Sequence, residues 1–297
     1  MQSRTYKYKK RQRQKRLRRL GVLLIALALG AVVVVVGIHV ANKTVKSEAL
    51  SQVDVLNGID EQTELKADWE KALNGNAPNV AIAAYDHKTK TTIVYSTGMS
   101  DNYYMASTVK VSVLANLLYQ QNNNDQELST EQDELATNMI ENSDNDATTT
   151  LVNDETLSSL DTFWSTVGMD DTHTDTDSWG LSQTTAADQV KLLNEIFYDG
   201  NVLPSTSRNY IKKLMGNVNE SQSWGISNGL GDNATYELKN GWLEYDKGWI
   251  VNSIGHVKDG DTNYTLAIYT YGSDSEDEGI DEVNDIAEAT YKYLTAE

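Results

Sequence analysis

The sequence predicts an α+β fold: one antiparallel sheet formed by N- and C-terminal strands, with an inserted helical region, preceded by a single transmembrane helix. Three observations indicate this. Runs of β-branched and aromatic residues lie at 80–95 and at 234–271. Helical periodicity fills the stretch from about 130 to 200. Because strands at the two ends must find partners for the domain to close, we expect them to pair with each other.

The N-terminal region divides into a basic part and an apolar part. We expect residues 1–20 to be a basic cytoplasmic tail, 21–41 a transmembrane anchor, 42–75 a stalk with the start of an N-terminal helix, and 76–297 the catalytic domain. Val22 to Val40 is long enough to cross a bilayer as a helix. The positive charge before it predicts a single-pass cell-membrane protein with an extracellular domain. A cleaved signal peptide is the alternative, although no convincing small-residue cleavage site is present.

Charge and cysteine content exclude several classes of function. The chain has a net charge of −18, and residues 1–45 carry eleven Lys and Arg without any Asp or Glu. The rest of the chain therefore carries a net charge of −29. A domain this acidic repels phosphate backbones, so nucleic-acid binding is excluded. The absence of cysteine excludes disulfides, thiolate chemistry, cysteine-based zinc sites and a lipoprotein anchor.

Hydrophobic periodicity predicts the elements in order. Leu65, Trp69 and Leu73 recur as on an amphipathic helix, and Val80–Tyr85 and Thr92–Tyr95 read as a hairpin. Further helices are expected at 108–119, 131–141, 147–152, 162–167, after a Thr185 cap, and at 280–294. Residues 216–233 are expected to be irregular. Strands are expected at 234–238, 249–256 and 264–271.

The helix at 108–119 is apolar almost all round, which is typical of a buried central helix, and it carries a single lysine. Ser107 stands at the expected N-cap, and Lys110 follows three residues later on the same face. A helix N-terminus can stabilise an oxyanion, and a desolvated lysine has a lowered pKa and can accept the serine proton. In the alternative interpretation, Ser107 is an ordinary cap and Lys110 reaches solvent.

Two further short motifs follow. Ser143-Asp144-Asn145 lies in a break between two predicted helices, and Lys239-Asn240-Gly241 closes a predicted strand. Each alone is ordinary turn or strand-end sequence. In this order and spacing, however, the three motifs resemble the S-x-x-K, S-D-N and K-T-G set of class A β-lactamases and penicillin-binding proteins. The segments around them, including Gly248 to Gly255, are also similar to that family.

The resemblance implies a role for each matching residue. Ser107 would be the acylated nucleophile, Lys110 its proton acceptor, and Ser143 a relay to the leaving nitrogen. Substrate binding would fall to Asn145, Lys239, Asn240, Gly241 and Trp242, with the backbone N–H of Trp242 completing an oxyanion hole with that of Ser107. The implied substrate is a β-lactam or a peptidoglycan stem peptide. No cofactor or metal is implied.

Two positions depart from the family pattern. Asn240 replaces a hydroxyl residue that binds the substrate carboxylate, although its amide can still donate. The loop at 170–185 has no glutamate to hold a hydrolytic water; Asp175 or Asp177 could substitute, but solvated loop acids are the simpler interpretation. The prediction is therefore a serine hydrolase of the class A β-lactamase type that deacylates slowly. The alternatives are a D-Ala-D-Ala carboxypeptidase-like enzyme and a non-hydrolytic peptidoglycan-binding surface protein.

Other apparent motifs carry little weight. Gly225-Ile226-Ser227-Asn228-Gly229 matches the G-x-S-x-G pattern, but no apolar strand precedes it and no helical pattern follows it. The four histidines are scattered along the chain without metal-ligand spacing. We therefore expect neither a nucleophile elbow nor a metal site.

Overall fold

The computed structural model describes residues 62–73, 79–97, 102–155, 157–198 and 200–296. The predicted tail and transmembrane segment, and the stalk up to residue 61, lie outside the described residues. Within the described ranges, no helix combines the length and the apolar character needed to cross a membrane.

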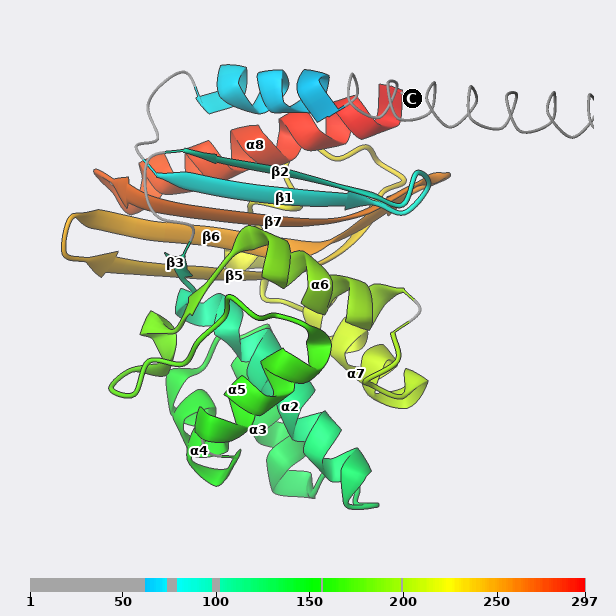
Figure 1. Cartoon of the computed structure of the whole chain (residues 1–297), viewed down its shortest axis with the longest axis vertical. Coiled ribbons are helices and arrows are strands. Elements are labelled where there is room, and N and C mark those ends of the chain that lie inside the picture. The colour runs from blue at the N-terminus through cyan, green and yellow to red at the C-terminus, as the bar shows by residue number, and fades with distance from the viewer. Residues whose placement is uncertain (1–61, 74–78, 98–101, 156, 199, 297) are drawn as a thin grey trace, which may run out of the picture. The chain divides into compact units, whose positions relative to one another are not determined.

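A five-stranded antiparallel sheet forms the centre of the domain (Figure 1). Its strands, in the spatial order β2-β1-β7-β6-β5, are β2 (Thr91–Thr97), β1 (Val80–Asp86), β7 (Thr262–Ser273), β6 (Gly248–Asp259) and β5 (Thr235–Tyr245). Ile82 of β1 faces Ile268 of β7, so the N-terminal hairpin joins the C-terminal strands as predicted. A two-stranded ribbon, β3 (Tyr103–Tyr104) with β4 (Gln183–Thr184), was not predicted, because two residues leave no periodic signal.

The helices follow the predicted order, with different bounds. They are 62–73, α2 (Val109–Asn123), α3 (Thr130–Glu141), α4 (Asn145–Glu155), α5 (Leu157–Val167), α6 (Ala186–Phe197), α7 (Ser205–Met215) and α8 (Glu276–Ala296), with 3₁₀ turns η1 (Ala106–Thr108), η2 (Trp179–Leu181) and η3 (Glu220–Gln222). Thr185 caps α6 as predicted, its hydroxyl accepting from the backbone N–H of Asp188 at 3.0 Å. Helix α7 was not predicted, because its first half is polar.

The sheet separates two hydrophobic cores (Figure 1). Alternate residues of a strand point to opposite faces. Ala81 and Ala83 of β1 therefore contact the helical region, whereas Val80 and Ile82 contact the layer of α8 and helix 62–73. The small alanine side chains let the helices approach the sheet closely on the face that carries the candidate site.

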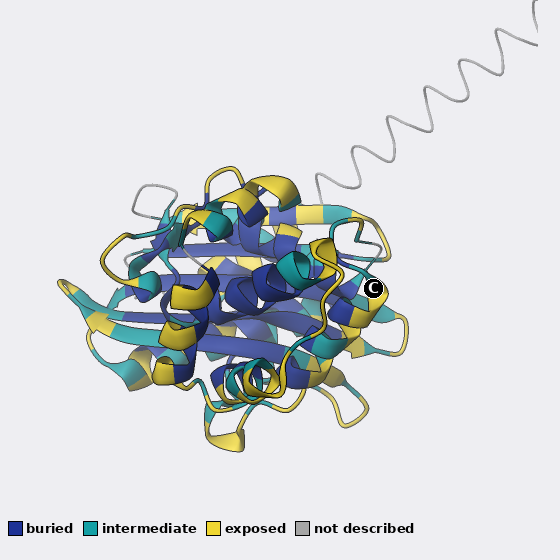
Figure 2. Ribbon diagram, turned by 90° about the horizontal axis from the view of Figure 1, so that it is seen from below, coloured by how far each residue is buried: buried dark blue, intermediate teal, exposed yellow. Residues whose placement is uncertain are grey.

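Helix α2 runs through the interior of the helical region. Its residues from Val109 to Leu118 are all buried, and α3, α4, α5 and α7 pack around it. Seen from below, the buried residues gather in the interior and the exposed ones on the outer turns (Figure 2). This packing confirms the predicted central helix and carries Lys110 out of contact with solvent.

Strand β5 is longer than predicted. Lys239-Asn240-Gly241 lies in the middle of the strand rather than at its end, because β5 continues to Tyr245 in pairing with β6. Within the described part of the chain, β5 is an edge strand of the five-stranded sheet. The η1 turn packs against both β5 and β6.

Candidate active site

The Ser107 side chain sits on the η1 turn, directly before α2. The prediction that Ser107 is the N-cap of this helix is therefore wrong. Thr108 is the N-cap residue, and its side chain makes no capping hydrogen bond. The Thr108 hydroxyl instead donates to the Met105 carbonyl at 2.7 Å. Ala106 has a φ of +46°, a left-handed conformation that non-glycine residues adopt at a cost. The turn is a strained platform that leaves Ser107 partly exposed while its neighbours are buried.

Asn252 holds this platform against the sheet. Its amide group on β6 donates to the carbonyl oxygens of Tyr104 at 2.9 Å and Met105 at 3.2 Å, and its Oδ1 accepts from the Thr270 backbone N–H. We assigned no role to Asn252 from the sequence. The available signal was a single amide inside the apolar run of a strand, a position where a polar side chain needs partners.

Gly241 brings β5 into direct contact with Ser107. A Cβ atom at position 241 would lie 2.6 Å from the Ser107 backbone nitrogen and 2.8 Å from that of Thr108. A glycine is therefore required for the strand to reach the amide groups of the turn. The next residue, Trp242, packs its ring against Trp224 at a centroid distance of 5.8 Å. The two backbone segments that we expect to form an oxyanion hole are thus adjacent.

Lys110 is fully buried and bound on several sides. Its Nζ lies 2.7 Å from the Ser143 carbonyl oxygen, 3.0 Å from the Ser143 hydroxyl and 2.8 Å from Asn145 Oδ1. Burial lowers the pKa of Lys110 to about 7, and the charge of Asp144 opposes that shift. In its neutral form the Lys110 amine has two N–H groups and one lone pair. If the two N–H groups donate to the Ser143 carbonyl oxygen and Asn145 Oδ1, the lone pair can accept a proton from a hydroxyl group.

Ser143 lies between α3 and α4 with a φ of +55°. This conformation turns both its carbonyl and its hydroxyl toward Lys110. Asp144 stabilises the turn, because its Oδ1 accepts from the Ala147 backbone N–H at 2.7 Å and its own N–H donates to the Asn138 carbonyl. Asp144 thus fixes the turn that carries Ser143.

A second lysine reaches the same hydroxyl. Lys239 Nζ lies 3.0 Å from Ser143 Oγ and 3.0 Å from the Asn240 carbonyl oxygen, and the side chain is fully buried. Burial, together with the charge of Lys110, holds the pKa of Lys239 well below its ordinary value. The Ser143 hydroxyl therefore contacts two amines, and the charge of Lys110 disfavours a charge on Lys239.

The Asn240 side chain binds the loop before β5. Its Nδ2 donates to the carbonyl oxygens of Gln222 at 2.8 Å and Trp224 at 2.9 Å. Asn240 is fully buried, and its Oδ1 has no hydrogen-bond partner among the described residues. Both N–H groups are occupied, so the donation to a substrate that we expected of this amide is not available in this arrangement.

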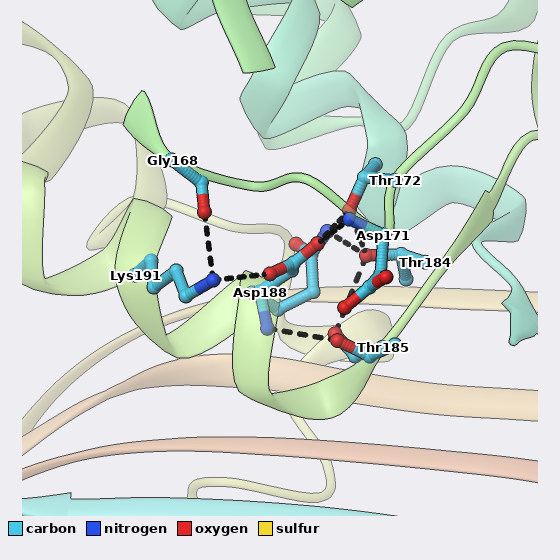
Figure 3. Close-up of polar contacts among 8 residues, drawn as sticks. Gly168, Asp171, Thr172, Thr184, Thr185, Asp188 and Lys191 are labelled. Atoms are coloured by element: carbon cyan, nitrogen blue, oxygen red, sulfur yellow. Dashed lines mark hydrogen bonds and ion pairs between the residues drawn. The ribbon is translucent and has the colours of Figure 1, made fainter. Parts of the chain in front are cut away.

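The loop at 170–185 is fixed at its start by Asp188 of α6 (Figure 3). This buried carboxylate accepts from the Asp171 backbone N–H and the Thr172 hydroxyl, both at 2.9 Å, and pairs with Lys191 at 2.8 Å. Lys191 also donates to the Gly168 carbonyl at 2.7 Å. The loop therefore has a defined path toward the candidate site.

The η2 turn of this loop places an indole beside Lys110. The Lys110 Nζ lies 5.1 Å from the ring centroid of Trp179, whose Nε1 donates to the Thr149 hydroxyl at 3.2 Å. Asp175 caps the preceding turn by accepting from the backbone N–H groups of Asp177 and Ser178. Among the described residues, no carboxylate forms an ion pair with Lys110.

The other motifs lie apart from this cluster. The Ser227 hydroxyl donates to the Ser223 carbonyl, in a region of turns before β5 rather than in a strand–turn–helix. His256 pairs with Glu237 at 2.8 Å. In the part of the chain that the structure describes, no group of three or more His, Asp or Glu side chains could hold a metal ion.

The antiparallel sheet, its inserted helices and the site between them define a serine hydrolase fold of the class A β-lactamase type. The sequence model of the Beta-lactamase enzyme family matches residues 125–294, more than half of the chain, and this protein belongs to that family. The matched region starts after Ser107 and Lys110 and contains the Ser143 and Lys239 motifs. No curated protein sequence matches the chain.

Solved structures support the same fold. TLA-1 extended-spectrum β-lactamase aligns with a TM-score of 0.68 at 18% identity, over 78% of this chain and 99% of its own. TLA-3 extended-spectrum β-lactamase aligns with a TM-score of 0.68 at 16% identity over the same shares. A class A β-lactamase representative from Bacteroides cellulosilyticus DSM 14838 aligns with a TM-score of 0.67 at 14% identity, again over 78% and 99%. At these identities the likeness concerns the fold alone.

Proposed function

We propose that this protein is a serine hydrolase that forms an acyl-enzyme on Ser107 with a β-lactam or a related peptide amide. One observation carries the proposal: a partly exposed serine stands on the turn before α2, and Lys110, three residues further along the chain, is joined through the Ser143 hydroxyl to Lys239. An ordinary capping serine would not require two buried lysines. Burying two lysine amines is costly even when they are hydrogen-bonded, and groups with strongly shifted pKa values cluster at functional sites.

The geometry supports the following acylation step. Ser107 Oγ attacks the carbonyl carbon, and its proton passes to the neutral amine of Lys110. The backbone N–H groups of Ser107 and Trp242 receive the oxyanion, each donor contributing about 3 kcal/mol to the barrier reduction. When the carbon–nitrogen bond breaks, Ser143 gives its proton to the leaving nitrogen and regains one from Lys110. The product is an ester on Ser107 and a free amine.

Deacylation is proposed to be slow. Hydrolysis of the ester requires a base that activates water near Ser107. On the loop side of Lys110 stands the ring of Trp179, which can neither accept a proton nor hold a water by a carboxylate. Asp175 is committed to its own turn and Asp177 is exposed, so neither supplies this base. A long-lived acyl-enzyme also suits the alternative of a peptidase-like, penicillin-binding protein.

A fluorescent penicillin tests the proposal. The purified wild-type protein is expected to become covalently labelled, and Ser107→Ala is expected to abolish the label. Ser227→Ala is the matched control, because Ser227 lies in the G-x-S-x-G segment and donates only to the Ser223 carbonyl. A wild-type protein that stays unlabelled by millimolar penicillin, offered both as the free acid and as the carboxamide, would overturn the acyl-enzyme and favour a non-hydrolytic binding protein.

We also propose that residues 21–41 anchor the domain outside the cytoplasmic membrane. The support is the sequence alone: an apolar run follows a strongly basic segment. The test is membrane fractionation with external protease, which should degrade the domain in intact cells stripped of their wall and leave a membrane-bound N-terminal fragment. Recovery of the protein in the soluble fraction would overturn the anchor.

A further inference from the structure

The leaving side of the candidate site lacks a receptor for a carboxylate. In penicillins, in cephalosporins and in D-Ala-D-Ala, the carbon bonded to the leaving nitrogen carries a carboxylate. Because Ser143 is the proposed donor to that nitrogen, the carboxylate would lie among the side chains next to the Ser143 hydroxyl. Lys239 is one of them, at 3.0 Å, and Asn240 follows it on β5.

Neither side chain offers what a carboxylate needs. An ionised carboxylate accepts hydrogen bonds and binds best to charged donors. Both N–H groups of Asn240 are held by the Gln222 and Trp224 carbonyls, and its remaining oxygen is an acceptor. Lys239 is fully buried, donates to the Asn240 carbonyl and Ser143, and burial favours its neutral form. A carboxylate placed here would bring two more acceptor oxygens next to Asn240, whose own Oδ1 has no hydrogen-bond donor.

The other amine at this hydroxyl is Lys110, and the carbonyl oxygens of Ser143 and Asn145 already bind it at 2.7 and 2.8 Å. Residues 62–297 contain one arginine, Arg208, which lies on α7 and donates to the Tyr198 carbonyl. Lys247 follows the end of β5, and the five residue steps along the strand from Asn240 to Tyr245 span about 17 Å. The loop that binds Asn240 carries an acid, Glu220, and no basic residue. An anionic substituent would therefore be repelled by the strongly acidic domain.

We propose that Asn240 makes this site select acyl donors whose leaving part is uncharged, such as an internal peptide amide or an amidated terminus, over donors with a free carboxylate. Because the Asn240 side chain is fully buried with both N–H groups on the loop, it offers a leaving-group carboxylate neither a donor nor a charge. The inference rests on the proposed acylation of Ser107 and specifies its substrate class: peptides cleaved within the chain rather than at a free carboxyl end.

The test compares two forms of one fluorescent penicillin, the free acid and the carboxamide, by their second-order rate constants for labelling. Each constant is divided by that probe's rate of alkaline hydrolysis, which removes the difference in intrinsic reactivity. Wild-type protein is expected to be labelled by the carboxamide at least as fast as by the acid. Asn240→Thr restores a hydroxyl donor and is expected to shift the ratio about tenfold toward the acid, the effect of one hydrogen bond to a charge.

The controls separate this inference from the proposed function. Asn228→Thr, a matched change at an amide that donates to the Asn284 carbonyl, should leave the ratio at the wild-type value. A wild-type preference for the acid of tenfold or more would overturn the inference while leaving acylation intact. Failure of both probes to label Ser107 would overturn the proposed function and, with it, this inference. The wild-type ratio decides the question even if Asn240→Thr does not fold.

Discussion

Gly241 and Ser107 lie so close that a single added methyl group on Gly241 would overlap the Ser107 amide, at 2.6 Å from its nitrogen. Gly241→Ala is therefore expected to push β5 away from the η1 turn and to misplace the proposed oxyanion donors. Loss of such a donor costs about 100-fold or more in rate. Labelling kinetics with a fluorescent penicillin measure the effect. Gly216→Ala is the control, because its Cβ would come no closer to another atom than 3.3 Å, to the Lys212 carbonyl oxygen.

The acylation rate is expected to rise with pH through the pKa of Lys110. The amine is a base only after it loses its proton, and burial places that pKa at about 7. The second-order rate constant should therefore be low at pH 5, half-maximal near pH 7 and constant above about pH 8. Stopped-flow labelling across this range measures it. A profile that still rises steeply at pH 9 would show that Lys110 is not the proton acceptor.

Asp144→Asn is expected to move this profile to lower pH. The Asp144 charge raises the pKa of Lys110, so its removal leaves burial unopposed and makes the neutral amine available at lower pH. An asparagine keeps the oxygen that accepts from the Ala147 N–H, so the turn should persist. Circular dichroism confirms the fold of the variant, and a shift toward higher pH would contradict the assignment.

Trp179→Glu is expected to shorten the lifetime of the acyl-enzyme. A carboxylate in place of the indole would stand beside Lys110 and supply a base for water, with general-base catalysis worth about 100-fold. Release of the label over time measures deacylation separately from acylation. Trp179→Phe keeps an apolar ring without a base and is the matched control. Equal lifetimes for the wild type and Trp179→Glu would show that the indole does not limit deacylation.

Asp188→Ala is expected to destabilise the domain by about 3 kcal/mol. The buried carboxylate accepts from the Asp171 N–H and the buried Thr172 hydroxyl, and the variant removes both hydrogen bonds and the Lys191 ion pair together. Lys191→Ala should cost less than about 1 kcal/mol, because the lysine side chain is 47% exposed. Urea denaturation measures both. Equal losses would mean that the ion pair, rather than the hydrogen bonds, fixes the loop.

The strands of the sheet, helix α2 and the grouping of the polar site residues could be predicted from the spacing of residues in the sequence. The hairpin at 80–95 and the paired C-terminal strands follow from period-two patterns, and α2 follows from its continuous apolar run. The sequence also related Lys110 to Ser143, which the structure places at 3.0 Å. What connected them was the order of three short motifs, since no single motif would have been sufficient.

The orientation of the Asn240 side chain and the position of Trp179 could not be predicted, because both depend on contacts with residues distant in the sequence or in irregular segments. Whether the Asn240 amide turns to a substrate or to a loop depends on where Gln222 and Trp224 lie, and those residues fall in a stretch without periodicity. The position of Trp179 over Lys110 depends on a turn built from Asp175 and neighbouring backbone groups. The sequence shows which side chains the loop at 170–185 carries, but it does not predict which of them lies next to Lys110.

The pairing of β1 with β7 makes the assembly of this domain a late event in its synthesis. The hairpin is made early, but its neighbour in the sheet, β7, leaves the ribosome only when the domain is nearly complete. Contacts between such distant segments form slowly, and the unpaired edge of β1 remains open to wrong partners in the meantime. Asn252 of strand β6 holds the turn that carries Ser107. Ser107 can therefore reach its final position only after the last quarter of the chain has been synthesised.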